Sequence, residues 1–267
     1  MSTEISKLSV TPDWMTADKN DGTEEMSRFV VFPRLVIVQP TAKDPLDKYD
    51  AGTPVIMPNE LVLSPFNKAE KHLSEPFVVV PIFFFAEYTL DNPREVWAAH
   101  GRVRERSFDH DSEIARKCSD WNARTFPCPE MQNKECVYTT RLNFILWLSS
   151  PTGAFNATPC MFTFKRAETR SGMAFNSLIK ARNAPIYGCQ FRADVGHRSN
   201  DKGQWYGLEL SNPQADIGGW VTNRELYEVY KQEHLRLKEA HESKMIAGSE
   251  TDELEDSTYT VDAAPEM

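Results

Sequence analysis

The chain has 267 residues, of which 40% are hydrophobic, and a formal net charge of −9. This length allows one large domain or two small ones with a substantial core. The negative charge lies at the two ends: residues 1–27 carry a net charge of −4 and residues 250–267 carry −7, which leaves about +2 for residues 28–249. The overall acidity therefore does not exclude a polyanionic partner for the body of the chain.

Three features bear on where the protein works. No cationic start followed by an apolar run is present after Met1, so we expect no secretory signal. The longest apolar run, Phe77–Ala86, is broken by Pro81 and has about half of the roughly 20 residues that a membrane helix needs. Five cysteines, an odd number, are typical of a reducing compartment rather than of a disulfide scaffold. We expect a cytoplasmic protein that does not contact a membrane.

The first part of the chain is predicted to hold an arm and short strands. Residues 1–27 are polar, acidic and without periodicity, which indicates a mobile arm. Order is predicted to begin at residue 28, with a strand over Phe29–Gln39 that Pro33 interrupts. Val55–Met57 and Leu61–Leu63 are predicted to form a small hairpin.

Two apolar segments follow as candidates for the centre of the core. Phe77–Leu90 gives the strongest strand signal, because it is rich in β-branched and aromatic residues and is apolar on both faces in its first half. Leu142–Leu148 is a second buried strand, while Val96–Arg106 mixes polarity without a clear period.

Residues 160–210 are predicted to add three strands and one short helix. Cys160–Lys165 alternates apolar and polar residues, and the helix follows over Gly172–Arg182. Ile186–Val195 and Gln204–Leu210 have the composition of strands and are joined by a predicted loop, residues 196–203. The chain is therefore predicted to be mainly β.

The C-terminal part is predicted to form a long helix and an acidic tail. Thr222 and Glu225 have the spacing of a capping box, and the chain then runs without Pro or Gly to about Ile246. The apolar stripe of this helix consists of Leu226, Val229, Tyr230, Leu237 and Ala240. The stripe packs either on the body or on a second copy, so a homo-oligomer stays open. His234 and His241 are expected on a solvated face, and residues 248–267 are expected to be disordered.

Three cysteines form a candidate metal site. Residues 109–137 are loop-like and poor in apolar side chains, and zinc stabilises such a segment through four Cys or His ligands. The candidate ligands are His110, Cys118, Cys128 and Cys136. Their spacing lacks the paired-knuckle form, so three unconnected thiols are the alternative. Cys160 and Cys189 lie in strands and are expected to be small buried hydrophobes.

Catalytic motifs are absent from the sequence. It contains no phosphate-binding Gly-rich loop, no GxSxG elbow and no HExxH. The three carboxylates of residues 109–113 could belong to a divalent-metal nuclease, but a solvated loop explains them more simply. We expect that the protein is not an enzyme.

Cations and aromatic rings alternate over residues 162–210. This stretch has eight Lys and Arg residues against four carboxylates. Cations that follow a phosphate backbone, next to rings on which bases stack, are what sequence-tolerant binding of single strands needs. The candidate binding residues are Lys165, Arg166, Arg170, Lys180, Arg182, Tyr187, Arg192, Arg198, Lys202 and Trp205. Tyr206, Leu208 and Leu210 are expected to point inward, which places Trp205 outward beside Gly207. The alternative is an ordinary sheet with core aromatics and solvated cations.

The order of these parts resembles the single-stranded DNA-binding proteins of tailed phages, a family with an oligonucleotide-binding (OB) barrel and an acidic, disordered C-terminus. The residues that carry the resemblance are Pro33-Arg34-Leu35, Pro81-Ile82-Phe83-Phe84-Phe85, Cys118 with Trp121 ahead of Cys136, Asn143-Phe144, Pro185-Ile186-Tyr187 and Asn200-Asp201-Lys202-Gly203-Gln204-Trp205-Tyr206. Some members of this broad class hold a structural zinc through Cys and His.

The resemblance implies an organisation and a role. The organisation is an OB-like β-barrel over residues 28–220 with a Cys-containing insertion at about 107–138, a helix over 221–247 and the tail over 248–267. The role is to coat single-stranded DNA during replication, recombination and repair. The tail would recruit replication and recombination proteins and compete for the DNA groove, since a strongly negative segment mimics DNA electrostatically. A phage virion or scaffold protein and, less favoured, a metal-dependent nuclease remain as alternatives.

Overall fold

The computed structural model describes residues 32–93, 96–123, 137–150, 156–200, 203–213 and 219–243. The predicted arm over residues 1–27 and the predicted tail over residues 248–267 lie outside these ranges, so both stay predictions. Residues 124–136, the second half of the predicted Cys-containing insertion, lie outside them as well.

A single curled sheet forms most of the fold. Its centre is an antiparallel meander of β6 (Phe77–Asp91), β8 (Val137–Ser149) and β9 (Asn156–Lys165). The hairpin of β10 (Phe191–Asn200) and β11 (Gly203–Ser211) returns to the start of β6, and β10 pairs antiparallel with it. β6 is long and apolar enough to pair on both sides, which places it in the middle of the sheet, as its composition predicts.

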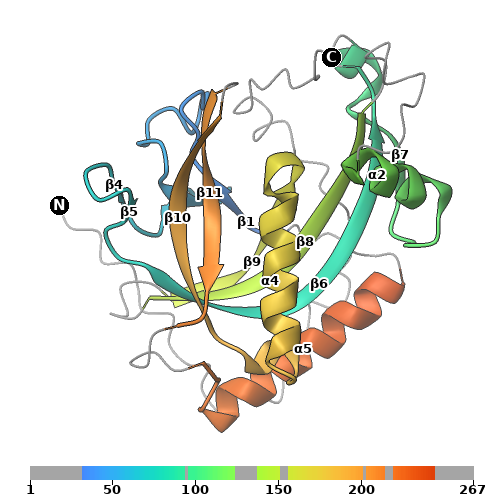
Figure 1. Ribbon diagram of the computed structural model, residues 1–267. Coiled ribbons are helices and arrows are strands. Elements are labelled where there is room, and N and C mark those ends of the chain that lie inside the picture. Colours follow the sequence, from blue (N-terminus) through green and yellow to red (C-terminus); the bar gives the residue numbers. More distant parts are fainter. Residues whose placement is uncertain are drawn as a thin grey trace, which may run out of the picture.

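Three short strands extend the other side of the sheet. β1 (Arg34–Ile37) runs parallel to β9 and pairs with β2 (Pro54–Met57). β2 and β3 (Leu61–Val62) form the predicted small hairpin. The strand order is β11-β10-β6-β8-β9-β1-β2-β3, and the sheet curls into a half-barrel (Figure 1).

Helices lie on both sides of this sheet. α4 (Thr169–Ala181) lies on the concave side beside β11, and α5 (Arg224–Glu242) lies on the convex side (Figure 1). α2 (Glu113–Ala123) packs on the far ends of β6 and β8, next to β7 (Val103–Ser107), which pairs with β6. The smaller elements are β4 (Phe66–Asn67), β5 (His72–Leu73), α1 (Trp97–His100), η4 (Arg166–Glu168) and η5 (Ile186–Gly188). None of the described helices is long and apolar enough to cross a membrane.

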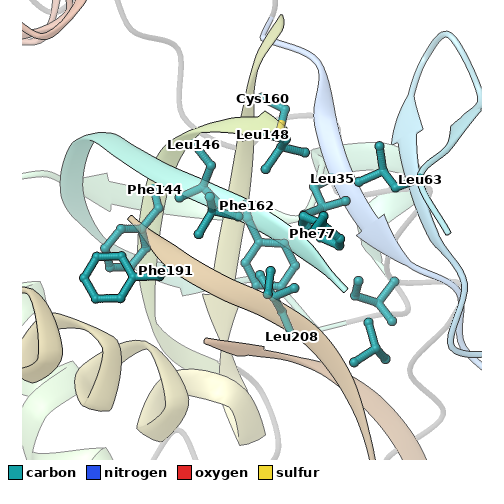
Figure 2. Packing of buried hydrophobic residues seen from close by; sticks show 14 of the residues in the cluster. Leu35, Leu63, Phe77, Phe144, Leu146, Leu148, Cys160, Phe162, Phe191 and Leu208 are labelled. Atoms are coloured by element: carbon teal, nitrogen blue, oxygen red, sulfur yellow. The ribbon is translucent and has the colours of Figure 1, made fainter. Parts of the chain in front are cut away.

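The barrel core is built from alternate residues of the long strands, with one or two residues from short ones. Figure 2 shows side chains from these strands gathered in one interior, among them Leu35, Phe77, Phe144, Phe162, Phe191 and Leu208. Phe175 of α4 enters the same core and packs against Phe144 and Phe191, with ring centroids 4.9 and 5.0 Å away. Burying one such aromatic side chain stabilises the fold by about 1.5–3 kcal/mol. Cys160 and Cys189 are buried here, as predicted.

The predicted fold class is confirmed. The protein is mainly β, and the order of meander, helix and returning hairpin is consistent with an OB-like barrel. β1 is not part of this meander and hairpin. It lies beside β9 and extends the sheet toward β2 and β3.

One side chain joins the two sides of the curled sheet. Gln39 follows β1 and is only 3% exposed. Its Nε2 donates to the carbonyl oxygen of Tyr206 at 2.8 Å, and its Oε1 accepts from the backbone N of Tyr206 at 2.9 Å. The side-chain amide thus pairs with β11 as a neighbouring strand would, and satisfies two backbone groups at the edge of β11.

The convex face of the meander is covered by α5. Tyr230 and Leu237 are buried in one cluster with Phe83, Phe85 and Met161. The predicted stripe is therefore correct at these two positions of α5 and docks on the body of the same chain. It is wrong at Leu226 and Val229, which are exposed.

Two further predictions about α5 are corrected. His234 and His241 are partly buried against the body rather than on a solvated face: His234 Nδ1 lies 2.7 Å from the carbonyl oxygen of Ile82, and His241 packs on Phe85. Burial lowers the pKa of His241. The N-cap is Asn223 rather than Thr222, because the Asn223 side chain accepts hydrogen bonds from the backbone of the first turn.

Two predicted loops contain regular structure. α2 lies within the predicted loop over residues 109–137. Residues 196–203 are mostly strand, since β10 continues to Asn200 and β11 begins at Gly203. Conversely, the predicted strand over residues 186–195 begins with a 3₁₀ turn, and its extended part starts only at Phe191.

The Gln39 bridge should contribute measurably to stability. Gln39→Ala leaves the partly buried backbone N–H and carbonyl of Tyr206 without these partners, each of which costs up to about 1–3 kcal/mol. We expect urea denaturation to show a loss of about 2–4 kcal/mol in the free energy of unfolding. Gln204→Ala is the matched control, because Gln204 is an exposed glutamine on β11 and should change stability by less than about 0.5 kcal/mol. Equal effects of the two variants would contradict a closing role for Gln39.

Candidate nucleic-acid interface

The β10–β11 hairpin brings one predicted cation and one predicted ring together. Arg198 lies directly opposite Trp205 in the ladder, so both side chains lie on one face of the hairpin. We call this the outer hairpin face. It consists of Arg192, Asp194, Gly196 and Arg198 on β10 and of Trp205, Gly207, Glu209 and Ser211 on β11.

The predicted orientation of β11 is confirmed. Leu208 is fully buried in the barrel core, and Tyr206 and Leu210 pack partly buried against it. Because successive side chains of a strand point to opposite faces, Trp205 lies on the outer hairpin face.

Arg198 ties this face to the start of α4. Its Nη1 donates to Ser171 Oγ at 2.8 Å, and its Nη2 lies 3.5 Å from Glu209 Oε1. Arg166 of η4 and Arg170 in the first turn of α4 are exposed. The hairpin and the start of α4 therefore bring together three of the predicted cations and Trp205.

The surface beside Trp205 is not the open glycine that the sequence predicts. A Cβ placed on Gly207 would overlap Oε1 of Glu168, a residue that is only 4% exposed. A Cβ on Gly196 would overlap Oε1 of the exposed Glu209. Both glycines thus lie beneath carboxylates, so a base cannot lie flat on Gly207 unless Glu168 moves.

Trp205 also carries a polar group that the fold does not satisfy. Its indole Nε1 is buried, and within the described part of the chain it has no hydrogen-bond partner. Such a buried donor costs about 1–3 kcal/mol and is uncommon in native structures. The unsatisfied indole N–H indicates a candidate binding site at this end of the hairpin.

The end of α4 brings together a second group of predicted cations. Lys180 is exposed in its last turn, and Arg182 caps the helix. The Arg182 guanidinium carbon lies 5.4 Å from the ring centroid of Phe191 and 5.2 Å from that of Trp220. Arg192, next to Phe191, lies 3.5 Å from Asp194 Oδ2.

Lys165 does not belong to this surface. It is 4% exposed and faces Arg141 in the β8–β9 ladder. Arg141 is itself fully buried, with Nη2 3.3 Å from Asp91 Oδ1, and Arg106 Nε lies 2.8 Å from Glu87 Oε1 on the same face. The prediction that Lys165 is a surface cation is wrong, because the position lies among buried charges of the meander.

Two other predicted residues fall elsewhere. Tyr187 lies in η5 and packs against Tyr227 and His234 of α5, with centroid distances of 5.4 and 5.1 Å. It is therefore a contact of the docked helix rather than a ring beside the cations. Lys202 lies outside the described residues.

The proposed metal ligands are only partly described. His110 Nδ1 lies 2.7 Å from the Tyr88 hydroxyl, and Cys118 is fully buried on α2 with Sγ 3.8 Å from the Thr89 carbonyl oxygen. Burial raises the pKa of the Cys118 thiol to about 11. Cys128 and Cys136 lie outside the described residues, within which no group of three potential ligands occurs. The zinc stays a prediction.

The acidic segment before α2 caps that helix. Ser112 Oγ accepts from the backbone N of Ala115 at 3.2 Å, and Asp109 Oδ1 accepts from that of Asp111 at 2.9 Å. A cavity of about 490 Å³ lies beside it. Its lining is Leu90, Arg104, Glu105, Ser107, Ser112, Glu113, Ile114, Lys117 and Tyr138. Lys117 is engaged by Glu113 at 3.1 Å, so the cavity offers balanced charges rather than a cationic site.

Comparison with known proteins assigns the chain to a family. The model of a family described as "Pam3 phage gp34-like protein" matches residues 4–243. The chain belongs to this family. It is therefore a phage protein. No curated protein and no solved structure matches the chain.

Sequence reasoning overlooked one aromatic residue of this phage protein. Trp220 is 45% exposed and lies against Arg182. It follows Gly218-Gly219, outside the cationic stretch, so its position in the chain gave no reason to connect it with Arg182. An isolated Trp near glycines was the signal present, and it is a weak one.

The two facing glycines give a test of this geometry. Gly207→Ala should lower the free energy of unfolding by about 1–3 kcal/mol, because the buried Glu168 side chain must move to make room. Gly196→Ala should be nearly neutral, because the exposed Glu209 side chain can rotate away. Chemical denaturation of both variants measures the difference, and a larger cost at Gly196 would show that the two carboxylates are wrongly placed.

Proposed function

We propose that this phage protein binds single-stranded DNA along the outer hairpin face and the start of α4. The observation that carries the proposal is the cross-strand pair of Arg198 and Trp205 on an OB-like barrel, joined to α4 through Ser171. OB barrels bind oligonucleotides on a strand surface and on the loops at its ends. Asn200 and Gly203 lie at such an end of the β10–β11 strand pair.

The chemistry of these residues suits a single strand. Arg166 and Arg170 are exposed and can neutralise phosphates, which gives affinity without regard to sequence. Trp205 offers an aromatic surface and an indole N–H that is unsatisfied among the described residues. Arg198 is already held by Ser171 and Glu209, so it orients the surface and adds positive potential beside Trp205.

The proposal includes a cellular role. The protein would coat single strands in the host cytoplasm during phage replication, recombination and repair, without enzymatic activity. Residues 250–267 hold seven carboxylates and no cation, which fits a segment that contacts basic replication and recombination proteins. A structural zinc held by His110, Cys118, Cys128 and Cys136 remains part of the proposal, and elemental analysis of freshly purified protein would test it.

Binding of an oligothymidine at several salt concentrations tests the main claim. We expect the logarithm of the affinity to fall linearly with the logarithm of salt concentration. The double variant Arg166→Gln/Arg170→Gln should weaken binding and flatten that slope by about 1.4, since each lost phosphate contact removes about 0.7. The matched control is Arg236→Gln/Lys238→Gln, which removes two exposed cations from α5 and should leave the slope unchanged.

The same titration separates the alternatives. A virion or scaffold protein would show no salt-dependent binding of the oligonucleotide. A metal-dependent nuclease would shorten the oligonucleotide when Mg²⁺ or Mn²⁺ is added. Equal slopes for the wild type and the Arg166/Arg170 variant would mean that DNA, if bound, lies elsewhere.

Deletion of residues 250–267 tests the competition by the tail. If the acidic segment occupies the same cationic surface, its removal should tighten binding of the oligonucleotide, most at low salt, where screening is weakest. Titrations of the full-length and truncated proteins at low salt give the comparison. Equal affinities would exclude competition and leave the DNA-binding surface unaffected.

A further inference from the structure

Trp220 is an exposed aromatic residue whose backbone is held on both sides. It is 45% exposed, and it forms an isolated β-bridge with Cys189, a fully buried residue. The backbone N of Gln190 donates to the carbonyl oxygen of Gly219 at 3.0 Å, and the backbone N of Val221 donates to that of Gly188 at 3.1 Å. The indole is therefore presented from a fixed point rather than from a free loop.

Arg182 supports one face of the Trp220 ring. Its guanidinium carbon lies 5.2 Å from the ring centroid of Trp220 and 5.4 Å from that of Phe191, and Phe191 is fully buried in the barrel core. The edge of the guanidinium is fixed as well, since Nη2 donates to Asn212 Oδ1 at 2.8 Å and Nη1 donates to the Gly219 carbonyl oxygen at 3.4 Å. The cation–π contacts of Arg182 with both rings thus connect an exposed indole to the core.

This arrangement changes the role predicted for Arg182. Its guanidinium contacts two aromatic rings and its donors point to Asn212 and Gly219, so it is a poor contact for a phosphate. Arg182 instead supports the Trp220 ring and helps to fix its orientation. A large aromatic side chain that is half exposed and rigidly oriented is typical of a surface that receives another flat group.

We propose that Trp220 is a stacking platform for a base of single-stranded DNA, with Arg182 as its positioning residue. The proposal rests on the proposed function and adds a second contact to it, at the opposite end of α4 from Trp205. Lys180 and Arg224 are exposed and close to Arg182 and Trp220 in sequence, and Glu225 is the carboxylate of the first turn of α5. Two exposed cations favour a flat partner that carries phosphates over an apolar protein surface.

Three variants and an oligothymidine test the platform. Trp220→Ala should weaken binding about tenfold or more, because one stacked base is lost. The salt dependence should keep its slope, since stacking neutralises no phosphate. Trp220→Phe keeps an aromatic face and should bind within about threefold of the wild type. Leu226→Ala is the matched control, because Leu226 is also 45% exposed, and it should bind as the wild type does.

Tryptophan fluorescence gives a second measurement that does not depend on the alanine variant folding. Quenching of the protein fluorescence on oligonucleotide binding should be smaller for Trp220→Phe than for the wild type, although both bind. Thermal unfolding of Trp220→Ala shows whether the fold is kept. If that variant unfolds, reduced quenching with retained affinity in Trp220→Phe still supports the platform, and unchanged quenching overturns it.

The outcomes distinguish this inference from the proposed function. If the wild type binds the oligonucleotide and folded Trp220→Ala binds equally well, the platform is wrong and the proposed function stands. If Leu226→Ala weakens binding as much as Trp220→Ala, the contact is a general apolar patch and the stacking role is wrong. If the wild type binds no single strand at any salt concentration, both proposals fall.

Discussion

The fold depends on β6 being apolar on both faces. Its inward residues, such as Phe77 and Val79, belong to the barrel core, and its outward residues, such as Ile82 and Phe83, form the floor on which α5 docks. A strand that is buried on both sides must lie in the middle of the sheet and needs a cover on its convex face. β8 of the meander and β10 of the returning hairpin pair with β6, and α5 covers its convex face. α4 lies on the opposite side of the sheet from α5. The surface proposed for DNA lies away from the face that α5 covers: it consists of the outer hairpin face, part of which lies beneath Glu168 and Glu209, and the start of α4.

The sequence predicts those parts of the fold whose apolar pattern has one interpretation. Phe77–Leu90 and Leu142–Leu148 are correctly placed because buried strands concentrate β-branched and aromatic residues. α2 falls in a predicted loop because the helix is largely polar, with Arg116 and Lys117 between Ala115 and Cys118, which are the buried residues in the described part of its packing. The composition of residues 196–203 predicts a loop because Gly, Ser, Asn and Asp usually mark turns. β10 nevertheless extends to Asn200 and β11 begins at Gly203, because the two strands pair with each other.

Local sequence patterns are equally limited in predicting which charged residues of the candidate site are exposed. Alternation along a strand correctly places Trp205 outside and Leu208 inside, since this depends only on local geometry. Whether a cation is exposed depends on what lies across the sheet, which no local pattern records. Lys165 is buried beside Arg141, and Arg182 contacts Phe191 and Trp220, because of residues distant in sequence. The resemblance to phage single-stranded DNA-binding proteins leads to the OB-like architecture, while the family match establishes a phage protein.

Under the proposed function, the position of α4 would set the scale of the single-strand path. Arg198 and Trp205 lie at its start through Ser171, and Arg182 and Trp220 lie at its end. A helix of 13 residues is about 20 Å long, which corresponds to about six nucleotides at the spacing of a B-form strand and to fewer in an extended strand. This length lies within the range of about 4–16 nucleotides covered by one OB barrel. Exposed Arg170 and Lys180 lie on the same helix between the two tryptophans, so a strand that contacts both rings would pass cations along its way. If both proposals hold, the two aromatic contacts would belong to one continuous track rather than to two competing sites.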